Sequence, residues 1–372
     1  MLRVIKDEQF DLYGHPTIEG KTVFDLLQEV QVKGSCRFNQ KQLGAFFPHE
    51  ERRYSQDWSA YNAAKTSEDG LFKRLLAELL FLAVEEPIQG RGRPKVLVRN
   101  RILSMCLKVY YRSDLRKAVS ILKELQGSYI GRAPSFKSLD NFFNDEDLSK
   151  LLDRLILITA LPLASMERTG AIDATGFSTS RIENWNAHKW SPRKGQRHRT
   201  WRKAHAVVGT KTNVVLAVDV TEKNVSDISM VKTVVGDKTK YFDMENFVAD
   251  KAYLSREVLG FLHRLGLNPY IPFKVNSRSH SHGEPMWNRL YRFFTDHQEE
   301  FMRKYHKRSN VETTFHMVKQ RFGDHCLTKN FTANVNEIKT KFLCHNLCVL
   351  IQESFENNIW IDFSTCAKKI SS

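Results

Sequence analysis

The chain has 372 residues, 57 of them Lys or Arg and 42 Asp or Glu, so its formal net charge is +15. An excess of this size indicates a polyanionic partner, with nucleic acid ahead of a membrane surface. No apolar run reaches the roughly 18 residues that span a bilayer, no signal-peptide core opens the chain and the cysteines form no CxxC pair, so we expect a cytoplasmic, nucleoid-associated protein that neither spans a membrane nor relies on disulfides.

The first 150 residues have the pattern of an all-helical region. Apolar residues at helical spacing predict helices over residues 70–86, 98–111, 113–125 and 135–143. Ser113 and Ser135 are the expected N-caps of the last two. Short helices with basic faces, at about 98–143, are compatible with a helix-turn-helix unit and equally with a plain helical bundle.

Basic residues are concentrated between Arg91 and Lys123, where ten Lys or Arg stand against one acid, Asp114. Within this run, Arg91 and Arg93 belong to an Arg-Gly-Arg-Pro motif that can lie in a narrow minor groove of DNA. The same motif also occurs as a simple turn before a helix. The charge favours a region, over about residues 1–150, that binds DNA.

The composition changes near Thr169, where short β-rich runs begin. Strands are predicted over residues 170–177, 204–210, 213–220, 246–250 and 268–273. Helices are predicted over residues 227–236, 255–265, 286–319 and 335–353, the third with room for a break near Tyr305. This order predicts an α/β domain at about 165–355, with a mixed sheet flanked by helices as in a ribonuclease-H-like fold, and a C-terminal tail at 356–372.

A long basic segment joins the first two predicted strands. Between Arg181 and Lys203 there are eight Lys or Arg, three Trp and one acid. Basic side chains there would neutralise phosphates and the Trp residues could stack on unpaired bases, although Trp residues packed on the domain would give the same pattern. The candidate DNA-binding residues of this segment are Arg193, Lys194, Arg197 and Arg199.

Two aspartates stand where a strand can fix them. Asp173 lies within the apolar run 170–177, and Asp250 ends the run 246–250. A carboxylate inside a small apolar strand is costly unless it is paired or bound to metal, and one just after a buried strand suits a site at the sheet edge. Hydrogen bonding to a nearby loop or capping of the next turn is the plain alternative for each. Asp219 and Asp227 are competing acids, and Asp227 has a ready role as a helix N-cap.

The third acid comes from a helical stripe. At about 100° per residue, Tyr305, Arg308, Glu312 and Lys319 share one stripe about 60° wide, and His316 joins it. A solvated charged face is the ordinary explanation. This stripe, however, holds a single acid between two cations, an arrangement that suits a metal ion flanked by phosphates.

At this point the pattern is recognisable. The spacing Tyr-x2-Arg-x3-Glu-x6-Lys over residues 305–319 resembles the signature of insertion-sequence transposases of the DDE class. The runs at 171–178 and 249–253 resemble the segments around the first and second catalytic aspartates of that family, and the run 220–227 resembles its turn after the third strand. The resemblance covers about residues 134–352.

The resemblance implies a ribonuclease-H-like catalytic domain in which Asp173, Asp250 and Glu312 hold two Mg²⁺ or Mn²⁺ ions. It implies that Arg308 and Lys319 contact DNA phosphates and that Tyr305 positions the backbone or a flipped base. Only 61 residues separate Asp250 from Glu312. That leaves no room for the large β insertion that some relatives use to form DNA hairpins.

We therefore expect a transposase that binds the terminal inverted repeats of an insertion sequence as a homodimer, cuts there and joins the 3′-hydroxyl to double-stranded target DNA. Two rival functions remain at this stage. One is a metal-dependent nuclease that cuts without joining, and the other is a domesticated DNA-binding protein without catalysis.

Overall fold

The computed structural model describes residues 57–88, 95–182, 199–236, 238–279 and 285–371, together with the short antiparallel strands β1 (Thr17–Ile18) and β2 (Lys21–Thr22). The chain divides into two compact units, Met1–Asp57 and Trp58–Ser372. All the elements described below belong to the second unit. Among the described residues, none of the helices combines the length and apolarity needed to cross a bilayer.

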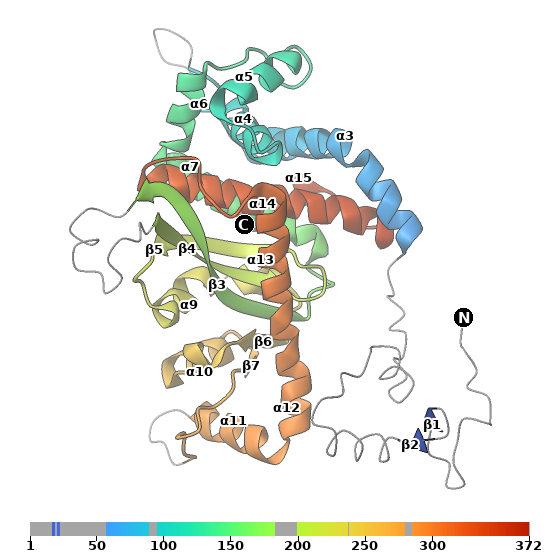
Figure 1. The fold of residues 1–372 in the computed structure, drawn as a ribbon, viewed down its shortest axis with the longest axis vertical. Helices are drawn as coiled ribbons and strands as arrows, with labels where there is room; N and C mark the ends of the chain where they lie inside the picture. Colours follow the sequence, from blue (N-terminus) through green and yellow to red (C-terminus); the bar gives the residue numbers. More distant parts are fainter. Residues whose placement is uncertain are drawn as a thin grey trace. The chain divides into compact units, whose positions relative to one another are not determined.

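A five-stranded mixed sheet forms the centre of this unit (Figure 1). Its strands are β3 (Thr169–Ile182), β4 (Arg199–Gly209), β5 (Val215–Glu222), β6 (Asn246–Ala249) and β7 (Asn268–Tyr270). They lie in the order β5-β4-β3-β6-β7, with β3, β4 and β5 antiparallel and β3, β6 and β7 parallel. The predicted mixed sheet with flanking helices is confirmed.

The helices are α3 (Trp58–Ala83), α4 (Val98–Tyr110), α5 (Leu115–Glu124), α6 (Phe136–Phe143), α7 (Glu146–Ala160), α9 (Asp227–Val235), α10 (Arg256–Arg264), α11 (Pro285–Asp296), α12 (Gln298–Tyr305), α13 (Ser309–Phe322), α14 (Phe331–Glu356) and α15 (Phe363–Ser371). Short 3₁₀ turns include η4 (Lys251–Tyr253) and η5 (His306–Arg308). Helix α14 is buried along most of its length and packs against α3, α7 and β5. It thus joins the helical layer to the sheet.

The two faces of the sheet are covered by different helices. Phe177 of β3 meets Phe342 of α14, with ring centroids 6.1 Å apart. On the other face, Lys203 and His205 of β4 meet Asp227 of α9. Since side chains alternate along a strand, Asp173 shares its face with Phe177, four residues on. Asp173 therefore lies on the α14 side.

Strand β3 is much longer than its neighbour β6. Only residues 169–172 of β3 pair with β6. Farther along, Ser178 donates its N–H to Asp324 O and accepts from Cys326 N, at 3.1 and 2.8 Å. The chain reaches this position by turning at Gly323, whose φ of 86° favours glycine. The segment that follows α13 is thus tied to the far end of β3.

The turn between β4 and β5 is built around a buried carboxylate. Glu167 is fully buried and accepts hydrogen bonds from the N–H groups of Lys211 and Thr212 and from the Thr212 hydroxyl, at 2.6–3.0 Å. A Cβ placed on Gly209 would lie only 2.3 Å from Glu167 Cδ. Because three hydrogen bonds hold the carboxylate in place, it cannot move aside cheaply.

We predict that Gly209→Ala destabilises the fold by about 1–3 kcal/mol, the usual range for overpacking a filled site. Urea unfolding measures this. The matched control is Gly131→Ala, because a Cβ there meets nothing within 4 Å, and its effect should stay within about 0.5 kcal/mol. Equal stability of the two variants would contradict this account of the turn.

The structure corrects several predicted boundaries. Helix α3 begins at Trp58 rather than near residue 70, and α5 is capped by Asp114, whose carboxylate accepts from Arg116 N and Lys117 N, rather than by Ser113. Ser135 does cap α6 as predicted. Residues 356–372, predicted as a C-terminal tail, include helix α15, which packs on α3 and α7. Phe363, the first residue of this helix, is fully buried.

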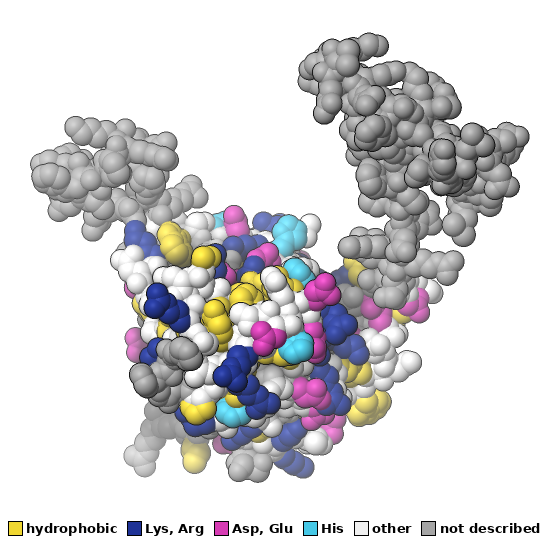
Figure 2. Space-filling view, turned by 90° about the horizontal axis from the view of Figure 1, so that it is seen from below, with side chains coloured by type: hydrophobic (Ala, Val, Ile, Leu, Met, Phe, Trp, Pro, Cys, Tyr) yellow, Lys and Arg dark blue, Asp and Glu magenta, His cyan; other side chains and the backbone are white. Residues whose placement is uncertain are grey.

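The positive charge of α4 is largely neutralised within the fold. Three cations of this helix form ion pairs: Arg99–Glu86, Arg101–Asp145 and Lys108–Glu337. On α5, by contrast, Arg116 and Lys117 are exposed. Figure 2 shows Lys and Arg interleaved with acidic and hydrophobic side chains on the face seen from below. The exposed positive charge of this region is therefore carried by α5 and not by α4.

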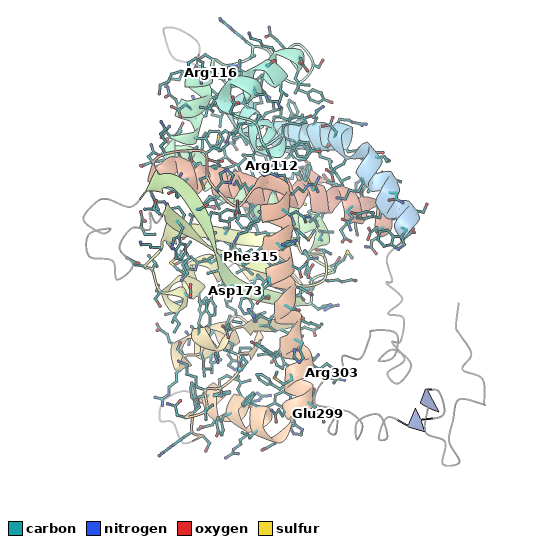
Figure 3. The ribbon with its side chains drawn as sticks, in the orientation of Figure 1. Arg112, Arg116, Asp173, Glu299, Arg303 and Phe315 are labelled. Atoms are coloured by element: carbon teal, nitrogen blue, oxygen red, sulfur yellow. The ribbon has the colours of Figure 1, made fainter. Side chains whose placement is uncertain are left out.

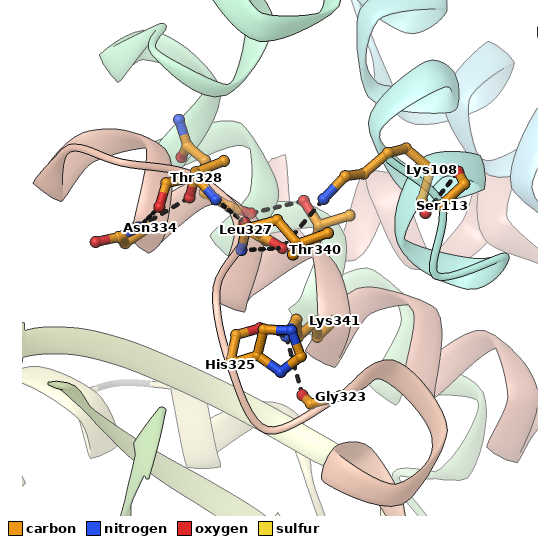
Figure 4. Close-up of polar contacts among 11 residues, drawn as sticks. Lys108, Ser113, Gly323, His325, Leu327, Thr328, Asn334, Thr340 and Lys341 are labelled. Carbon is orange, nitrogen blue, oxygen red and sulfur yellow. Dashed lines mark hydrogen bonds and ion pairs between the residues drawn. The ribbon is translucent and has the colours of Figure 1, made fainter. Parts of the chain in front are cut away.

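A buried ionic network lies between α4, α14 and the segment after α13 (Figure 4). Glu337 and Lys108 are 2% and 3% exposed, and Lys108 Nζ lies 3.1 Å from Glu337 Oε1. The same carboxylate accepts from Leu327 N and Thr328 N at 2.9–3.2 Å. Glu337 thus holds the backbone of this segment as well as a buried cation.

Lys341 completes the network by donating to Gly323 O and His325 O at 2.9 and 2.7 Å. Burial lowers the pKa of Lys341, and the Glu337 carboxylate opposes that effect. Burial would raise the pKa of Glu337, but Lys108, Lys341 and the backbone N–H groups outweigh it and hold that pKa below its ordinary value. Glu337 and Lys341 therefore each stabilise the charged form of the other.

Candidate active site

Two aspartates occupy matching positions on neighbouring parallel strands. The pairing of β3 with β6 ends at Ile172 and Ala249. Asp173 is the next residue of β3, and Asp250 is the first residue after β6. Asp250 also caps η4, with its Oδ1 accepting from Lys251 N at 2.6 Å. The parallel register therefore brings these two carboxylates to the same level of the sheet.

Arg308 connects the first aspartate, which is labelled in Figure 3, to the helix that carries the third acid. Its Nη1 lies 2.8 Å from Asp173 Oδ2, and its Nη2 lies 2.5 Å from Glu312 Oε1. The side chain of Asp173 is 23% exposed and that of Glu312 is 59% exposed. The site therefore runs from a half-buried carboxylate on the sheet to an exposed one at the rim.

The surroundings of Asp173 shift the pKa of its carboxyl group. Burial raises the pKa of Asp173 above the ordinary aspartate value, and the carboxylates of Asp250 and Glu312 act in the same direction. The N–H of Ala174, which donates to Asp173 Oδ1 at 2.8 Å, and the Arg308 guanidinium act against it. All three predicted acids are thus within electrostatic reach of one another.

The predicted stripe of residues 305–319 spans a break between two helices. Tyr305 ends α12, Arg308 ends η5, and Glu312 and Lys319 lie on α13. The expected break near Tyr305 is confirmed. Lys319 Nζ lies 5.4 Å from the centroid of the Phe177 ring on β3. Helix α13 therefore runs alongside β3, with Glu312 near Asp173 and Lys319 near Phe177.

Two tyrosines border the acids. Burial raises the pKa of Tyr305, with Asp250 and Asp173 adding to the effect and Arg308 opposing it. Tyr253, in η4, is 1% exposed, and its hydroxyl has no hydrogen-bond partner among the described residues. Burial, followed by the nearby carboxylates of Asp173, Asp227 and Asp250, raises its pKa. Sequence reasoning noted Tyr253 only as part of a motif and missed that it is buried beside the acids.

The competing acids have other partners. Asp227 pairs with Lys203 at 2.5 Å on the opposite face of the sheet, and it is the first residue of α9 rather than its N-cap, which is Ser226. Asp219 accepts from its own neighbour Val220 N at 2.8 Å. Cys344 and Cys348, one helical turn apart on α14, are buried free thiols.

The donor chemistry of the three acids fits a hard divalent cation, because such ions prefer carboxylate oxygens. In the described part of the chain, no three acidic, His or Cys side chains converge closely enough to hold a metal ion as they stand. The Arg308 guanidinium lies between Asp173 and Glu312 and takes an oxygen of each. The side chain of Glu312 is 59% exposed, so packing leaves it room for other rotamers.

Several predicted DNA-binding residues lie outside the described residues: Arg91, Arg93, Arg193, Lys194 and Arg197. Arg199 opens β4, where it is the Cα partner of Ile182, but its side chain is likewise not described. Of the three Trp residues of that basic segment, Trp201 lies against Gly176 on the neighbouring strand. This Trp follows the packing alternative at least in part, being 36% exposed.

Comparison with known proteins bears directly on this site. Residues 164–347 match a family described as Transposase DDE domain. An uncharacterized protein of Aquifex aeolicus (strain VF5) is 26% identical over 272 residues, which cover 70% of this chain and 80% of that protein. No solved structure matches the chain. The matched range includes Asp173, Asp250 and Glu312.

Proposed function

We propose that this chain, which matches the family described as Transposase DDE domain over residues 164–347, is a transposase that cuts DNA at the ends of an insertion sequence and joins the freed 3′-hydroxyl to target DNA. The observation that carries the proposal is the matched register of Asp173 and Asp250, with Arg308 linking Asp173 to Glu312. A mixed sheet with its first acid mid-strand and its last on a helix is also the arrangement of a ribonuclease-H-like domain.

Asp173, Asp250 and Glu312 would hold two Mg²⁺ or Mn²⁺ ions. When bound, such a pair supplies activation of the attacking oxygen and stabilisation of the leaving one. The strands fix the two aspartates through the sheet, whereas Glu312 has the freedom of an exposed helical side chain. Phosphoryl transfer requires little of the protein beyond such positioning and the stabilisation of negative charge.

The cations of the stripe would position DNA. A guanidinium that already meets two carboxylates can exchange one of them for a phosphate, because both are oxyanions that accept paired N–H bonds. We therefore assign Arg308 and Lys319 to phosphates near the cleaved bond. Tyr305, beside Arg308, would support the DNA backbone or a displaced base.

We predict that Lys319→Ala weakens DNA binding and lowers the slope of log K against log salt concentration by about one unit, because one phosphate contact is lost. Fluorescence anisotropy over a salt series measures this. Lys319→Arg keeps the charge and should keep the slope. Since Lys319 also lies over Phe177, circular dichroism checks that the Ala variant is folded. An unchanged slope in a folded Ala variant would remove Lys319 from the phosphate contacts.

The deciding experiment is a strand-transfer assay with the purified protein, Mg²⁺ or Mn²⁺, and duplexes made from the DNA on either side of its gene. Joined products support the transposase. Cutting without joining would support a nuclease, and binding without cutting would support a domesticated DNA-binding protein. Intact carboxylates at all three positions argue against the last of these outcomes.

The partners follow from the same proposal. Two transposon ends have to be held together during transfer, so we propose a homodimer on double-stranded DNA, with residues 1–150 contributing to recognition of the ends. We place this activity in the cytoplasm, at the nucleoid. Light scattering of the protein with and without end DNA measures the assembly.

A further inference from the structure

A cavity of about 740 Å³ opens between the helical layer and the segment after α13. Its walls come from parts of the chain that are distant in sequence: the starts of α5 and α6 on one side and residues 327–330 on the other. Figure 3 shows Arg116, one of its lining residues, on α5 at the upper end of the view. We call this cavity the α5–α6 groove.

The α5–α6 groove is lined by an excess of exposed cations. Arg116, Lys117 and Lys137 come from the helices, and Lys329 comes from the opposite wall. Lys137 is paired with Asp140 at 2.9 Å, and the other lining acid, Asp114, is engaged as the cap of α5. Within the described part of the chain, neither Lys117 nor Lys329 has an ion-pair partner, so both charges remain available to a ligand.

The groove also combines an exposed aromatic ring with positive charge, which suits an anion that carries apolar groups. Phe136 is 47% exposed, and the Arg116 guanidinium lies 5.0 Å from the centroid of its ring. The N-terminal turns of α5 and α6 border the cavity, and the N-cap of α14, Asn330, lines it as well. Helix N-termini carry partial positive charge, so they add to the field of the side chains.

The wall that carries Lys329 is fixed to the framework of the catalytic helix. Leu327 and Thr328, which line the groove, donate their N–H groups to the buried Glu337. Lys341 holds Gly323 and His325 at the end of α13. A ligand in the groove is therefore held on the same framework that positions Glu312.

We propose that the α5–α6 groove binds the phosphate backbone of a DNA segment away from the carboxylates, with Lys117 and Lys329 on its two walls each neutralising a phosphate. The proposal rests on the proposed function, because it assumes that DNA is the substrate. The unpaired charges on opposite walls select a polyanion long enough to span them. A sequence-independent phosphate contact of this kind positions the substrate without reading its bases.

The test is binding of a fluorescent random-sequence duplex of about 30 base pairs, because phosphate contacts do not depend on sequence. Lys117→Ala/Lys329→Ala should lower the slope of log K against log salt by about two units and weaken binding roughly tenfold at physiological salt. The matched control is Lys240→Ala/Lys368→Ala, which removes two exposed charges that do not line the groove. The control should keep nearly the native slope.

A second measurement detects the contact directly. A photo-crosslinking amino acid at Phe136 should form adducts with the duplex, whereas the same group at Phe81, which is 70% exposed on α3, should form few. If native protein binds DNA while the groove variant keeps its affinity and slope and Phe136 forms no adduct, the groove inference fails and the proposed function stands. If native protein neither binds nor cuts DNA, both fail. An acidic peptide that competes only in the native protein, with no DNA adduct, would also overturn the DNA assignment.

Discussion

Glu312→Gln will lower metal-dependent DNA cleavage by at least about 10³-fold, the loss that corresponds to several kcal/mol of charge stabilisation in the transition state. The amide keeps the shape of the side chain and an oxygen that can accept from Arg308 Nη2, so the fold and DNA binding should persist. Cleavage of end DNA measures the first effect. Calorimetric titration with Mn²⁺, independent of turnover, should show weakened metal binding.

The control for this substitution is Asp219→Asn. Asp219 competed with the proposed acids in the sequence, but it accepts from Val220 N and is not linked to Arg308. Its replacement should leave cleavage within about twofold of native, as expected for a group outside the transition state. Full activity in Glu312→Gln, or complete loss in Asp219→Asn, would overturn the assignment of the third acid.

The largest loss of stability is expected from Glu337→Leu. This change leaves the buried cations Lys108 and Lys341 without their carboxylate and two backbone N–H groups without an acceptor. Removing one partner of a buried ion pair typically costs about 3–5 kcal/mol. Urea unfolding at neutral pH measures the change in the free energy of unfolding.

Two further measurements sharpen this prediction. Adding Lys108→Met to Glu337→Leu removes one uncompensated cation and should recover part of the loss. Because the pKa of Glu337 is lowered in the folded protein, the stability it contributes is full above its ordinary pKa of 4.5 and is lost as the pH falls below that value. Native protein should therefore lose this contribution in acid, whereas Glu337→Leu should not. A cost below about 1 kcal/mol at neutral pH would contradict the role of the network.

Much of the fold could be predicted from local sequence patterns. The sheet, its strand sequence and the break near Tyr305 were all predicted, because alternating and helical periodicities are local properties of the chain. Helix α7 was not predicted, since its second half is buried on every side and lacks an amphipathic period. The first turns of α3 were missed, and Glu68 of this helix is paired there with Arg321 of α13, a contact that has no local signal.

In the candidate site, too, the residues could be predicted from the sequence, whereas several of their contacts could not. The three acids were found from strand ends and helix spacing, and the parallel register then brought Asp173 beside Asp250. The bridging position of Arg308 could not be predicted, because spacing places a side chain on a face without saying which residue of another element it meets. The burial of Tyr253 and the α5–α6 groove likewise depend on packing between distant segments.

The unequal lengths of β3 and β6 have a consequence for access. Beyond residue 172, no strand of the described part pairs with this side of β3 until the contact at Ser178. On this side Asp173 is met by Arg308 of η5 and not by a strand of the sheet. In the proposed reaction a DNA phosphate would therefore reach the first aspartate by displacing a side chain, while the hydrogen bonds of the sheet stay in place.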